Sequence, residues 1–588
     1  MKILLAAVNA KYIHSNLAVY SLRANLLNYK SYVKLKEYTI NHQREDVIQD
    51  IYLEQPDVLV LSCYIWNIDF IQSILADIKK VLPQIDIWLG GPEVSYLSET
   101  FLREHPHVKG IMRGEGEVTF RELTALYVDK HTDLNQICGL TYRSKQGGSI
   151  LSTPDRTPSN MDDFAFPYED LTDFENRIIY YESSRGCPYS CAYCLSSVDK
   201  SVRFRSLSLV EKELLFFIEH RVPQVKFVDR TFNCSHKHTM GIFKIIKEYD
   251  NGITNFHFEI SADILNQEEL EFLSTLRPGL VQLEIGVQSV NEQTILAIHR
   301  KTKFEKLKEN VLFIKQKGNI HQHLDLIAGL PYEGYESFAH SFNAVYDMRP
   351  QQLQLGFLKV LKGANIYEVH KQYGIVYSDK PPYEVLYTDW LSFDEIIRLK
   401  QVEEMVEVYY NSMQFMRTME FLLASFTDAF AMYESLGRYY EEKGLFKVSH
   451  SRMARYEILL NFAEEKLLKD MEEIKQEMFF SCLKECLLYD LYLRENLKNR
   501  PQWADSQENY KEKIRLFYKR EAQEKRYLTD YEKTEEKQLY RMTHLEVFHY
   551  DVQSSFDRKE LSILFDYEHR SPLSHEAKTF LITELMSL

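Results

Sequence analysis

Residues 177–194 have the sequence RIIYYESSRGCPYSCAYC, a short apolar run followed at once by three cysteines. The run Arg177–Ser184 predicts a β-strand, because β-branched and aromatic residues favour an extended backbone. Cys187, Cys191 and Cys194 then follow with the spacing C-x3-C-x2-C. Cysteines this close together form a metal-binding pattern, and they fall in the loop after a strand, where β/α folds build their active sites.

Three thiolates leave one coordination position of a metal centre open. A 4Fe–4S cluster held by Cys187, Cys191 and Cys194 would therefore have one iron free to bind a substrate or cofactor. Structural zinc is the alternative, and it would need a fourth ligand such as His236 or His238.

The strand at Arg177–Ser184 is the first of six strands predicted between residues 176 and 370, and stretches with helical spacing separate them. In Val281–Ser289 every second residue is apolar, and the residues between are polar or glycine. One apolar and one polar face predicts a partial (β/α)6 TIM-like barrel whose lumen holds a ligand. A half-solvated antiparallel sheet is the alternative. The other predicted strands are Val225–Thr231, Phe256–Asp263, His323–Gly329 and Gln352–Leu361.

Residues 1–145 also alternate between strand and helix patterns. Five strand–helix units of this kind predict a doubly wound parallel sheet, so the whole chain belongs to the α/β class. Ligands of such sheets bind beyond the carboxyl ends of the strands. The loops at those ends are 9–15, 62–67, 90–93 and 114–117, and the last two are rich in glycine.

Two further regions complete the predicted organisation. Residues 146–175 contain several glycines and prolines and predict a linker. Residues 371–588 predict a mostly α-helical domain, with long helical patterns in Ala431–Glu442 and Arg455–Leu497 and two strands at His544–Val552 and Leu561–Tyr567.

The composition excludes several classes of protein. The formal net charge of −15 disfavours broad binding to nucleic acid or to an anionic membrane. No apolar run reaches the roughly 20 residues of a membrane-spanning helix, and the short apolar N-terminus does not predict a secretory signal. We therefore expect a cytoplasmic protein. The basic stretch Tyr510–Arg526 predicts a solvated helix face, and Cys482 and Cys486 predict core packing.

The cysteine loop resembles that of the radical S-adenosylmethionine (SAM) enzymes, which carry C-x3-C-x-aromatic-C after a first strand. The resemblance implies that the open iron binds the amino and carboxylate groups of SAM. It also implies that the cluster reductively cleaves SAM to a 5′-deoxyadenosyl radical. Tyr193 matches the aromatic residue near the adenine. A flavodoxin- or ferredoxin-type electron donor is then an expected partner.

Motifs on the later strands match the same family. The segments ending the second, fourth and fifth strands resemble its SAM-contacting positions. The chain has Asp229-Arg230-Thr231 where many members have Gly-Gly-Glu. The residues that the resemblance assigns to SAM or the lumen are Asp229, Thr231, Glu284, Gln288, Ser289, Asp325 and Gly329.

The N-terminal domain resembles the cobalamin-binding domain that precedes some radical SAM barrels. The methylthiotransferase alternative needs three cysteines in this domain, which has only Cys63 and Cys138. The spacing around His14 departs from D-x-H-x-x-G, so we expect cobalamin to bind without ligation by this histidine. The residues assigned to cobalamin are Asn9, His14, Ser62, Trp66, Gly90, Gly91, Glu93 and Glu115.

These resemblances together predict a cobalamin-dependent radical SAM enzyme with a 4Fe–4S cluster, SAM and cobalamin as cofactors. The expected reaction is methylation of an unactivated carbon. Two alternatives stay open: a rearrangement or ring-forming reaction without methyl transfer, and a non-catalytic cobalamin- or redox-sensing protein. The sequence does not identify the substrate.

Overall fold

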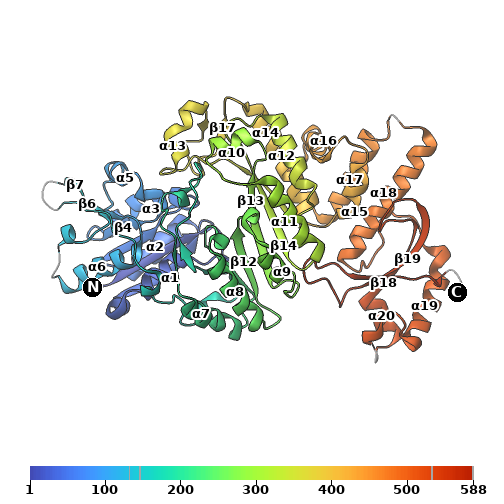
Figure 1. Ribbon diagram of the computed structural model, residues 1–588, viewed down its shortest axis with the longest axis horizontal. Helices are drawn as coiled ribbons and strands as arrows, with labels where there is room; N and C mark the ends of the chain where they lie inside the picture. The colour runs from blue at the N-terminus through green and yellow to red at the C-terminus, as the bar shows by residue number, and fades with distance from the viewer. Residues whose placement is uncertain (131–132, 145–147, 470, 532–533, 586–588) are drawn as a thin grey trace. The chain divides into compact units, whose positions relative to one another are not determined.

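The computed structural model describes residues 1–130, 133–144, 148–469, 471–531 and 534–585 (Figure 1). The chain forms two compact units. Unit 1 comprises residues 1–320, 327–334 and 356–393, and unit 2 comprises residues 321–326, 335–355 and 394–588.

Unit 1 begins with a parallel sheet, as predicted for a doubly wound domain. Its parallel strands have the order β2-β1-β3-β4-β5. Two strands that we did not predict, β6 (Leu140–Arg143) and β7 (Ile150–Ser152), extend it antiparallel. Strand β7 lies within the segment predicted as a linker, of which residues 146 and 147 lie outside the described residues. The parallel strands are β1 (Ile3–Asn9), β2 (Val33–Thr39), β3 (Val58–Ser62), β4 (Asp86–Gly90) and β5 (Gly110–Met112).

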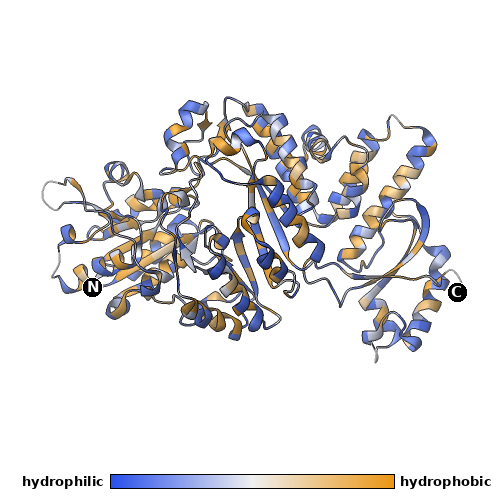
Figure 2. Ribbon diagram, viewed as in Figure 1, coloured by the Kyte–Doolittle hydropathy of each residue, from blue (hydrophilic) through white to orange (hydrophobic). Residues whose placement is uncertain are grey.

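Helices cover both faces of this sheet. On one face, α2 (Arg44–Glu54), α3 (Ile68–Val81) and α5 (Ser98–Glu104) contribute to a single apolar core with the strands. Helices α1 (Leu17–Ala24) and α6 (Gly116–Asp129) pack against each other. Figure 2 shows apolar strands at the centre of this domain and helices that carry both polar and apolar residues. Ligands of such sheets bind beyond the carboxyl ends of the strands.

A second sheet follows in the chain, with the strand order β15-β14-β13-β12-β11-β8. Its strands β8, β11, β12 and β13 pair in parallel, which excludes the half-solvated antiparallel alternative. Helices α7 (Leu207–Glu219) and α8 (His236–Glu248) follow β8 and β11 and pack against each other. The strands are β8 (Ile179–Tyr181), β11 (Gln224–Phe227), β12 (Asn255–Ile260), β13 (Val281–Gln288), β14 (His321–Ala328) and β15 (Gln352–Phe357).

The predicted alternation of β13 is confirmed. Its apolar residues Val281, Leu283, Ile285 and Val287 are completely buried. Between them, Gln282, Glu284 and Gly286 are only partly buried. This strand therefore has one face in an apolar core and one polar face, as a ligand-holding lumen requires.

Unit 2 is largely helical, as predicted, and contains a small antiparallel sheet. The helical pattern Arg455–Leu497 covers two helices, α17 and α18. The third strand, β20 (Lys578–Leu581), was not predicted. The other elements are α12 (Tyr335–Tyr346), α14 (Phe393–Val406), α15 (Met416–Leu423), α16 (Ala429–Glu442), α17 (Arg452–Lys466), α18 (Glu473–Arg494), α19 (Lys511–Glu524), α20 (Glu536–Met542), β18 (Thr543–Tyr550) and β19 (Arg558–Asp566).

Helix α18 packs against the small sheet. Its residues Cys482 and Cys486 are buried in an apolar cluster with side chains of β18 and β19, as predicted for core cysteines. A second apolar cluster includes Phe517 of α19 and Leu539 of α20 and covers other side chains of the same strands. The sheet is thus sandwiched between helices.

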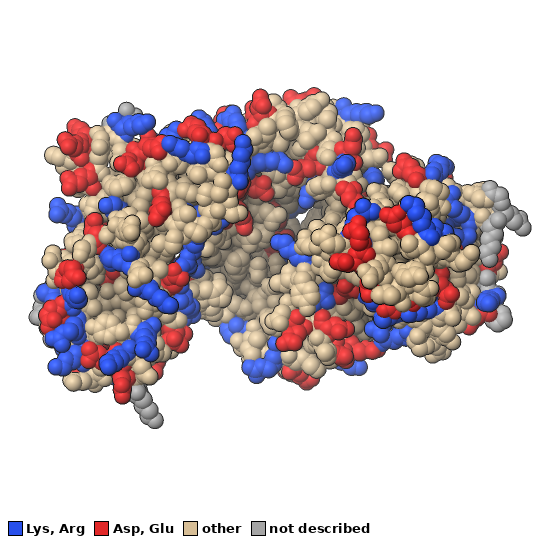
Figure 3. Space-filling model, turned by 180° about the vertical axis from the view of Figure 1, so that it is seen from behind, with Lys and Arg blue, Asp and Glu red and all other residues tan. Residues whose placement is uncertain are grey.

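The surface carries both signs of charge. On the face shown in Figure 3, Lys and Arg side chains are interspersed with Asp and Glu side chains. No helix among the described residues is both long and apolar enough to span a membrane.

Candidate active site

The three cysteines of the motif lie in a loop that is closed at its base by a short hairpin. Strand β9 (Ser184–Arg185) pairs antiparallel with β10 (Arg203–Phe204). Between β9 and the first cysteine, Gly186 has a φ of +90°, and a Cβ there would lie 2.6 Å from the carbonyl oxygen of Ser201. Only glycine fits this close approach without strain.

Backbone hydrogen bonds fix the cysteine loop from three directions. The amide of Cys187 donates to the carbonyl of Asp199 at 3.0 Å, and the amide of Ala192 donates to the carbonyl of Ile298 at 2.9 Å. The amide of Ile366 donates to the carbonyl of Ala192 at 2.8 Å. The thiols of Cys187 and Cys191 are buried, that of Cys194 is half-buried, and none forms a disulfide. This donor set fits a 4Fe–4S cluster with one open iron.

Arg300, which is not among the predicted site residues, contacts this loop. Its Nη1 donates to the hydroxyl of Tyr193 at 3.1 Å and lies 3.9 Å from the Sγ of Cys191. Its Nη2 donates to the carbonyl of Gly286 in β13 at 2.5 Å. Burial raises the pKa of the Cys191 thiol, and the nearby guanidinium opposes that shift. Arg300 therefore places a buried positive charge where thiolates must form.

At the end of β11, Asp229 and Thr231 approach the base of the loop. The carboxylate of Asp229 is completely buried and accepts hydrogen bonds from the Ser183 amide and from the hydroxyls of Ser183 and Ser184. Burial raises the pKa of this carboxyl. The Oγ1 of Thr231 lies 3.6 Å from the Sγ of Cys187. Both residues are thus at the cysteine loop, and Asp229 already binds the strand that leads into it.

Strand β13 carries a second set of predicted residues. The Oε2 of Glu284 lies 2.9 Å from Lys226 Nζ and 3.0 Å from His257 Nε2. Gln288 is 9% exposed and has a φ of +73°. Its Oε1 is buried and has no hydrogen-bond partner among the described residues. A buried amide oxygen of this kind fits a position that a bound ligand completes.

The remaining predicted SAM residues have internal partners. Ser289 donates from its hydroxyl to Glu333 at 2.6 Å. Asp325 Oδ1 lies 3.0 Å from His323 Nε2, so these two β14 residues form a pair. Gly329 has a φ of +87°, and a Cβ there would lie 2.7 Å from a methyl group of Val385.

Four of the predicted cobalamin residues, Asn9, His14, Ser62 and Trp66, lie at the carboxyl ends of β1 and β3 and in the loops that follow them. Asn9 donates to Glu37 at 2.7 Å and to the carbonyl of His14 at 3.1 Å. The Nδ1 of His14 lies 2.7 Å from the hydroxyl of Tyr180 in β8. Ser62 accepts a hydrogen bond from Asn16 at 3.3 Å. His14 thus connects the first loop to the second sheet.

Large apolar side chains are exposed in the same loops. Trp66 is 44% exposed and stacks on Tyr64 with 4.4 Å between ring centroids. Tyr12 and Ile13 of the first loop and Tyr96 after β4 are also exposed. Apolar surface gathered at the ligand-binding edge of a sheet fits a large, flat and partly apolar ligand such as a corrin.

Gly91 allows close backbone approach in the loop after β4. It has a φ of +108°, and a Cβ there would lie 2.4 Å from the carbonyl of Cys63. Its neighbour Gly90 ends β4 beside Met112 of β5. The loops after β3 and β4 are therefore packed backbone against backbone.

Glu93 and Glu115 are engaged in side-chain contacts within unit 1. Glu93 is buried, accepts a hydrogen bond from the Tyr383 hydroxyl and lies 3.4 Å from Lys362 Nζ. Glu115 accepts from Arg203 at 2.6 Å. These carboxylates therefore connect the first domain to later segments of the same unit.

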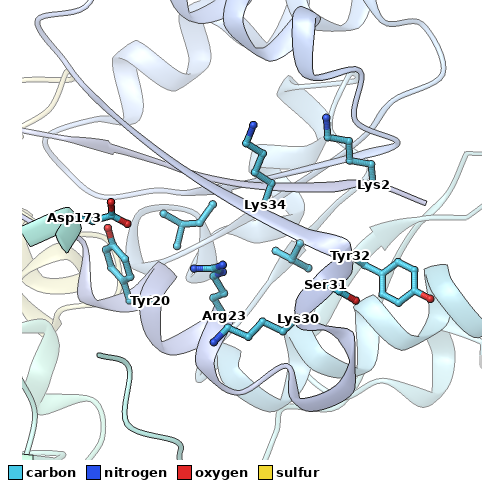
Figure 4. Close-up of a pocket in the computed structure, with 10 residues that line it drawn as sticks. Lys2, Tyr20, Arg23, Lys30, Ser31, Tyr32, Lys34 and Asp173 are labelled. Carbon is cyan, nitrogen blue, oxygen red and sulfur yellow. The ribbon is translucent and has the colours of Figure 1, made fainter. Parts of the chain in front are cut away.

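A pocket of about 590 Å³ lies at the β2 edge, apart from the cysteine loop. Figure 4 shows Arg23, Lys30 and Tyr20 among its lining residues. Lys2 and Lys34 contribute to the lining, but both pair with Glu54 at 2.8 and 2.6 Å. None of the predicted site residues lines this pocket.

Comparisons with protein families agree with this geometry. Residues 3–124 match the B12 binding domain, residues 181–345 match the radical SAM superfamily, and residues 371–565 match a protein of unknown function, DUF4080. The chain is a radical SAM protein with a B12-binding domain. These domains imply a 4Fe–4S cluster, SAM and cobalamin as its cofactors, in agreement with the donor set and the loops described above.

Curated relatives of this radical SAM protein include more than one kind of enzyme. It is 27% identical over 353 residues to the cobalamin-dependent radical SAM methyltransferase TokK of Streptomyces tokunonensis, covering 55% of this chain and 50% of TokK. It is 24% identical over 323 residues to the anaerobic magnesium-protoporphyrin IX monomethyl ester cyclase of Rubrivivax gelatinosus, covering 53% of this chain and 58% of the cyclase. The chain thus spans about half the length of these relatives.

Among solved structures, the fold is similar to that of the radical SAM methyltransferase TsrM from Kitasatospora setae, with tryptophan substrate and a SAM analogue bound. The TM-score is 0.52 at 16% identity, and the match covers 65% of this chain and 80% of TsrM. This likeness concerns the fold alone.

Proposed function

We propose that this radical SAM enzyme transfers a methyl group to an unactivated carbon of its substrate. The observation that carries the proposal is the loop with three cysteines, in the same compact unit as the B12-binding domain. Three thiolate ligands would leave one iron of a 4Fe–4S cluster open. The methyltransferase relatives support the choice of reaction. A carbon without a lone pair must first be converted to a carbon radical before it can accept a methyl group. SAM with the cluster would generate that radical, and cobalamin would supply the methyl group.

When bound, the cluster supplies the electron that cleaves SAM, and cobalamin supplies the methyl group. The protein's part is to hold and orient these groups. Cys187, Cys191 and Cys194 would bind three irons, and the amide oxygen of Gln288 would accept a hydrogen bond from SAM. Arg300 would hold Tyr193, and with it the cysteine loop, beside β13. The exposed Trp66 and its partner Tyr64 would present an aromatic surface to the corrin.

The experiment uses the full chain reconstituted with iron, sulfide and cobalamin under reducing, oxygen-free conditions. We expect the wild type to form 5′-deoxyadenosine from SAM and the Cys187→Ala, Cys191→Ala and Cys194→Ala triple variant to form none. Cys234→Ala is the matched control, because Cys234 is half-buried, follows β11 and lies outside the motif. A triple variant that still cleaved SAM would contradict the proposal.

The reaction type is decided by product mass. With a small-molecule extract as the source of substrate, methyl transfer adds about 14 Da to one component. A second candidate is a ring-forming reaction, which the likeness to the Rubrivivax cyclase favours. That reaction would give 5′-deoxyadenosine and a product without an added methyl group.

A further inference from the structure

Arg230 occupies a fixed position at the base of the cysteine loop. It lies in the turn after β11, between Asp229 and Thr231. Asp229 is bound to Ser183 and Ser184 through three hydrogen bonds. Thr231 places its Oγ1 3.6 Å from the Sγ of Cys187. Because both neighbours of Arg230 are held in this way, its backbone is fixed beside the cluster site.

The side chain of Arg230 is exposed and has no hydrogen-bond or ion-pair partner among the described residues. The neighbouring cations of unit 1 differ in this respect, since each is already bound to an acidic group or to the cysteine loop. Their partners are Glu117 and Glu182 for Arg185, Glu115 and Asp199 for Arg203, Glu284 for Lys226, and Cys191 and Tyr193 for Arg300.

Arg230 also acts electrostatically on the loop that follows β3. Burial raises the pKa of the Tyr64 hydroxyl to about 12, and the charge of Arg230 is the largest opposing influence. Tyr64 stacks on Trp66 in the loop predicted to meet cobalamin. The backbone of Arg230 thus lies beside the cysteine loop, and its charge acts on the loop that carries this aromatic pair.

A guanidinium binds carboxylate and phosphate groups through two parallel hydrogen bonds, and it keeps its charge at any physiological pH. We propose that Arg230 binds an anionic group, a carboxylate or a phosphate, of the second substrate at the mouth of the barrel. This inference rests on the proposed function and adds that the molecule to be modified is an anion.

The proposal is tested by equilibrium dialysis of radiolabelled inorganic pyrophosphate against the full chain loaded with cluster, cobalamin and SAM. We expect the wild type to bind pyrophosphate at one site per chain and Arg230→Gln to bind it at least tenfold more weakly. Arg230→Lys should lose less affinity, because lysine keeps the charge but cannot form two parallel hydrogen bonds. Arg221→Gln is the matched control. Arg221 is an exposed arginine in the turn before β11, at the opposite end of the same strand, and its variant should bind as the wild type does.

SAM binding is measured in parallel, from the change that SAM causes in the electron paramagnetic resonance spectrum of the reduced cluster. We expect Arg230→Gln to retain this change. Equal pyrophosphate binding in Arg230→Gln and the wild type overturns the proposal. A tenfold loss of SAM binding with pyrophosphate binding intact also overturns it, because the anion would then be the carboxylate of SAM.

The failure of the proposed function would look different. Suppose that the wild type forms no 5′-deoxyadenosine, and that pyrophosphate binds to the wild type but not to Arg230→Gln. The proposed reaction is then wrong, and anion recognition by Arg230 stands. If SAM is cleaved and the variant keeps the site, the reaction stands and the role of Arg230 falls.

Discussion

The guanidinium of Arg300 lies 3.9 Å from the Sγ of Cys191, so a buried positive charge adjoins one of the three cysteines of the motif. The same guanidinium binds the Tyr193 hydroxyl and the carbonyl of Gly286. It thus connects the cysteine loop to strand β13. A cation in this position stabilises the more negative, reduced state of a cluster.

We expect Arg300→Gln to lower the reduction potential of the reconstituted cluster by roughly 60 mV, a tenfold change in the one-electron equilibrium. Removing the positive charge makes addition of an electron less favourable, and Arg300→Lys should shift the potential less. A redox titration followed by electron paramagnetic resonance measures this. The exposed neighbour Lys301 provides the control variant Lys301→Gln, and an equal shift in both variants would contradict a specific role.

The ion pair of Glu117 and Arg185 connects the first turn of α6 to β9, the strand before the cysteines. Burial raises the pKa of Glu117, but the charge and hydrogen bonds of Arg185 outweigh it, and the pKa lies below its usual value. We expect Glu117→Gln to destabilise the protein by about 3 kcal/mol at pH 7, because Arg185 stays buried with less compensation. Chemical denaturation of the cluster-free protein measures this.

The pH dependence of this ion pair has a definite sign. A carboxyl whose folded pKa is depressed stabilises the protein above its unfolded pKa of about 4.5. The difference between wild type and Glu117→Gln should therefore be constant near neutral pH and shrink as the pH falls below about 4.5. A difference that grew on acidification would refute this account.

The fold of the first 360 residues could be predicted from patterning, because buried parallel strands and amphipathic helices leave a clear periodic signal. Strand β13 spans Val281–Gln288, one residue shorter than the predicted Val281–Ser289. Strands β6 and β7 were missed because they are short, and β7 lies beside glycines that indicate a turn. Strand β20 was missed for the same reason.

The site was predictable only where residue types and spacing carry the chemistry. Cys187, Cys191 and Cys194 meet that condition, and the structure places them in one closed loop. Arg300 does not meet that condition. The basic residues Lys301 and Lys303 lie beside it in the sequence, so nothing in the pattern distinguishes Arg300 from them. Its role depends on a long-range contact with Cys191, 109 positions earlier in the chain.

Substitution of His14 tests whether this histidine is a ligand of the cobalt in cobalamin. Its Nδ1 lies 2.7 Å from the Tyr180 hydroxyl, and burial together with the charges of Lys11, Lys226 and Arg177 lowers its pKa, so the ring is neutral at pH 7. We expect the absorption spectrum of bound cobalamin to be the same in wild type, His14→Ala and Tyr180→Phe. A band shift in His14→Ala that is absent from Tyr180→Phe would show ligation by the histidine.

Asp490 of α18 gives unit 2 a pH dependence of its own. The carboxylate is 1% exposed and accepts hydrogen bonds from the amides of Arg417 and Thr418 and from the Thr418 hydroxyl, at the start of α15. Burial nevertheless raises the pKa of Asp490 to about 7. The folded protein therefore binds this proton between about pH 4 and 7, whereas the unfolded chain does not.

Stability must fall with rising pH wherever the folded state binds more protons than the unfolded state. Between pH 4 and 7, Asp490 should cost the wild type up to about 4 kcal/mol relative to its value at pH 4. In Asp490→Asn this slope disappears, because an amide does not titrate, although the lost acceptor at Thr418 lowers stability at every pH. The free energy of unfolding of the full chain, measured in urea at both pH values, should therefore differ between the two proteins by an amount that shrinks as the pH rises. Parallel pH profiles would mean that Asp490 is ionised throughout this range and that its three hydrogen bonds outweigh its burial.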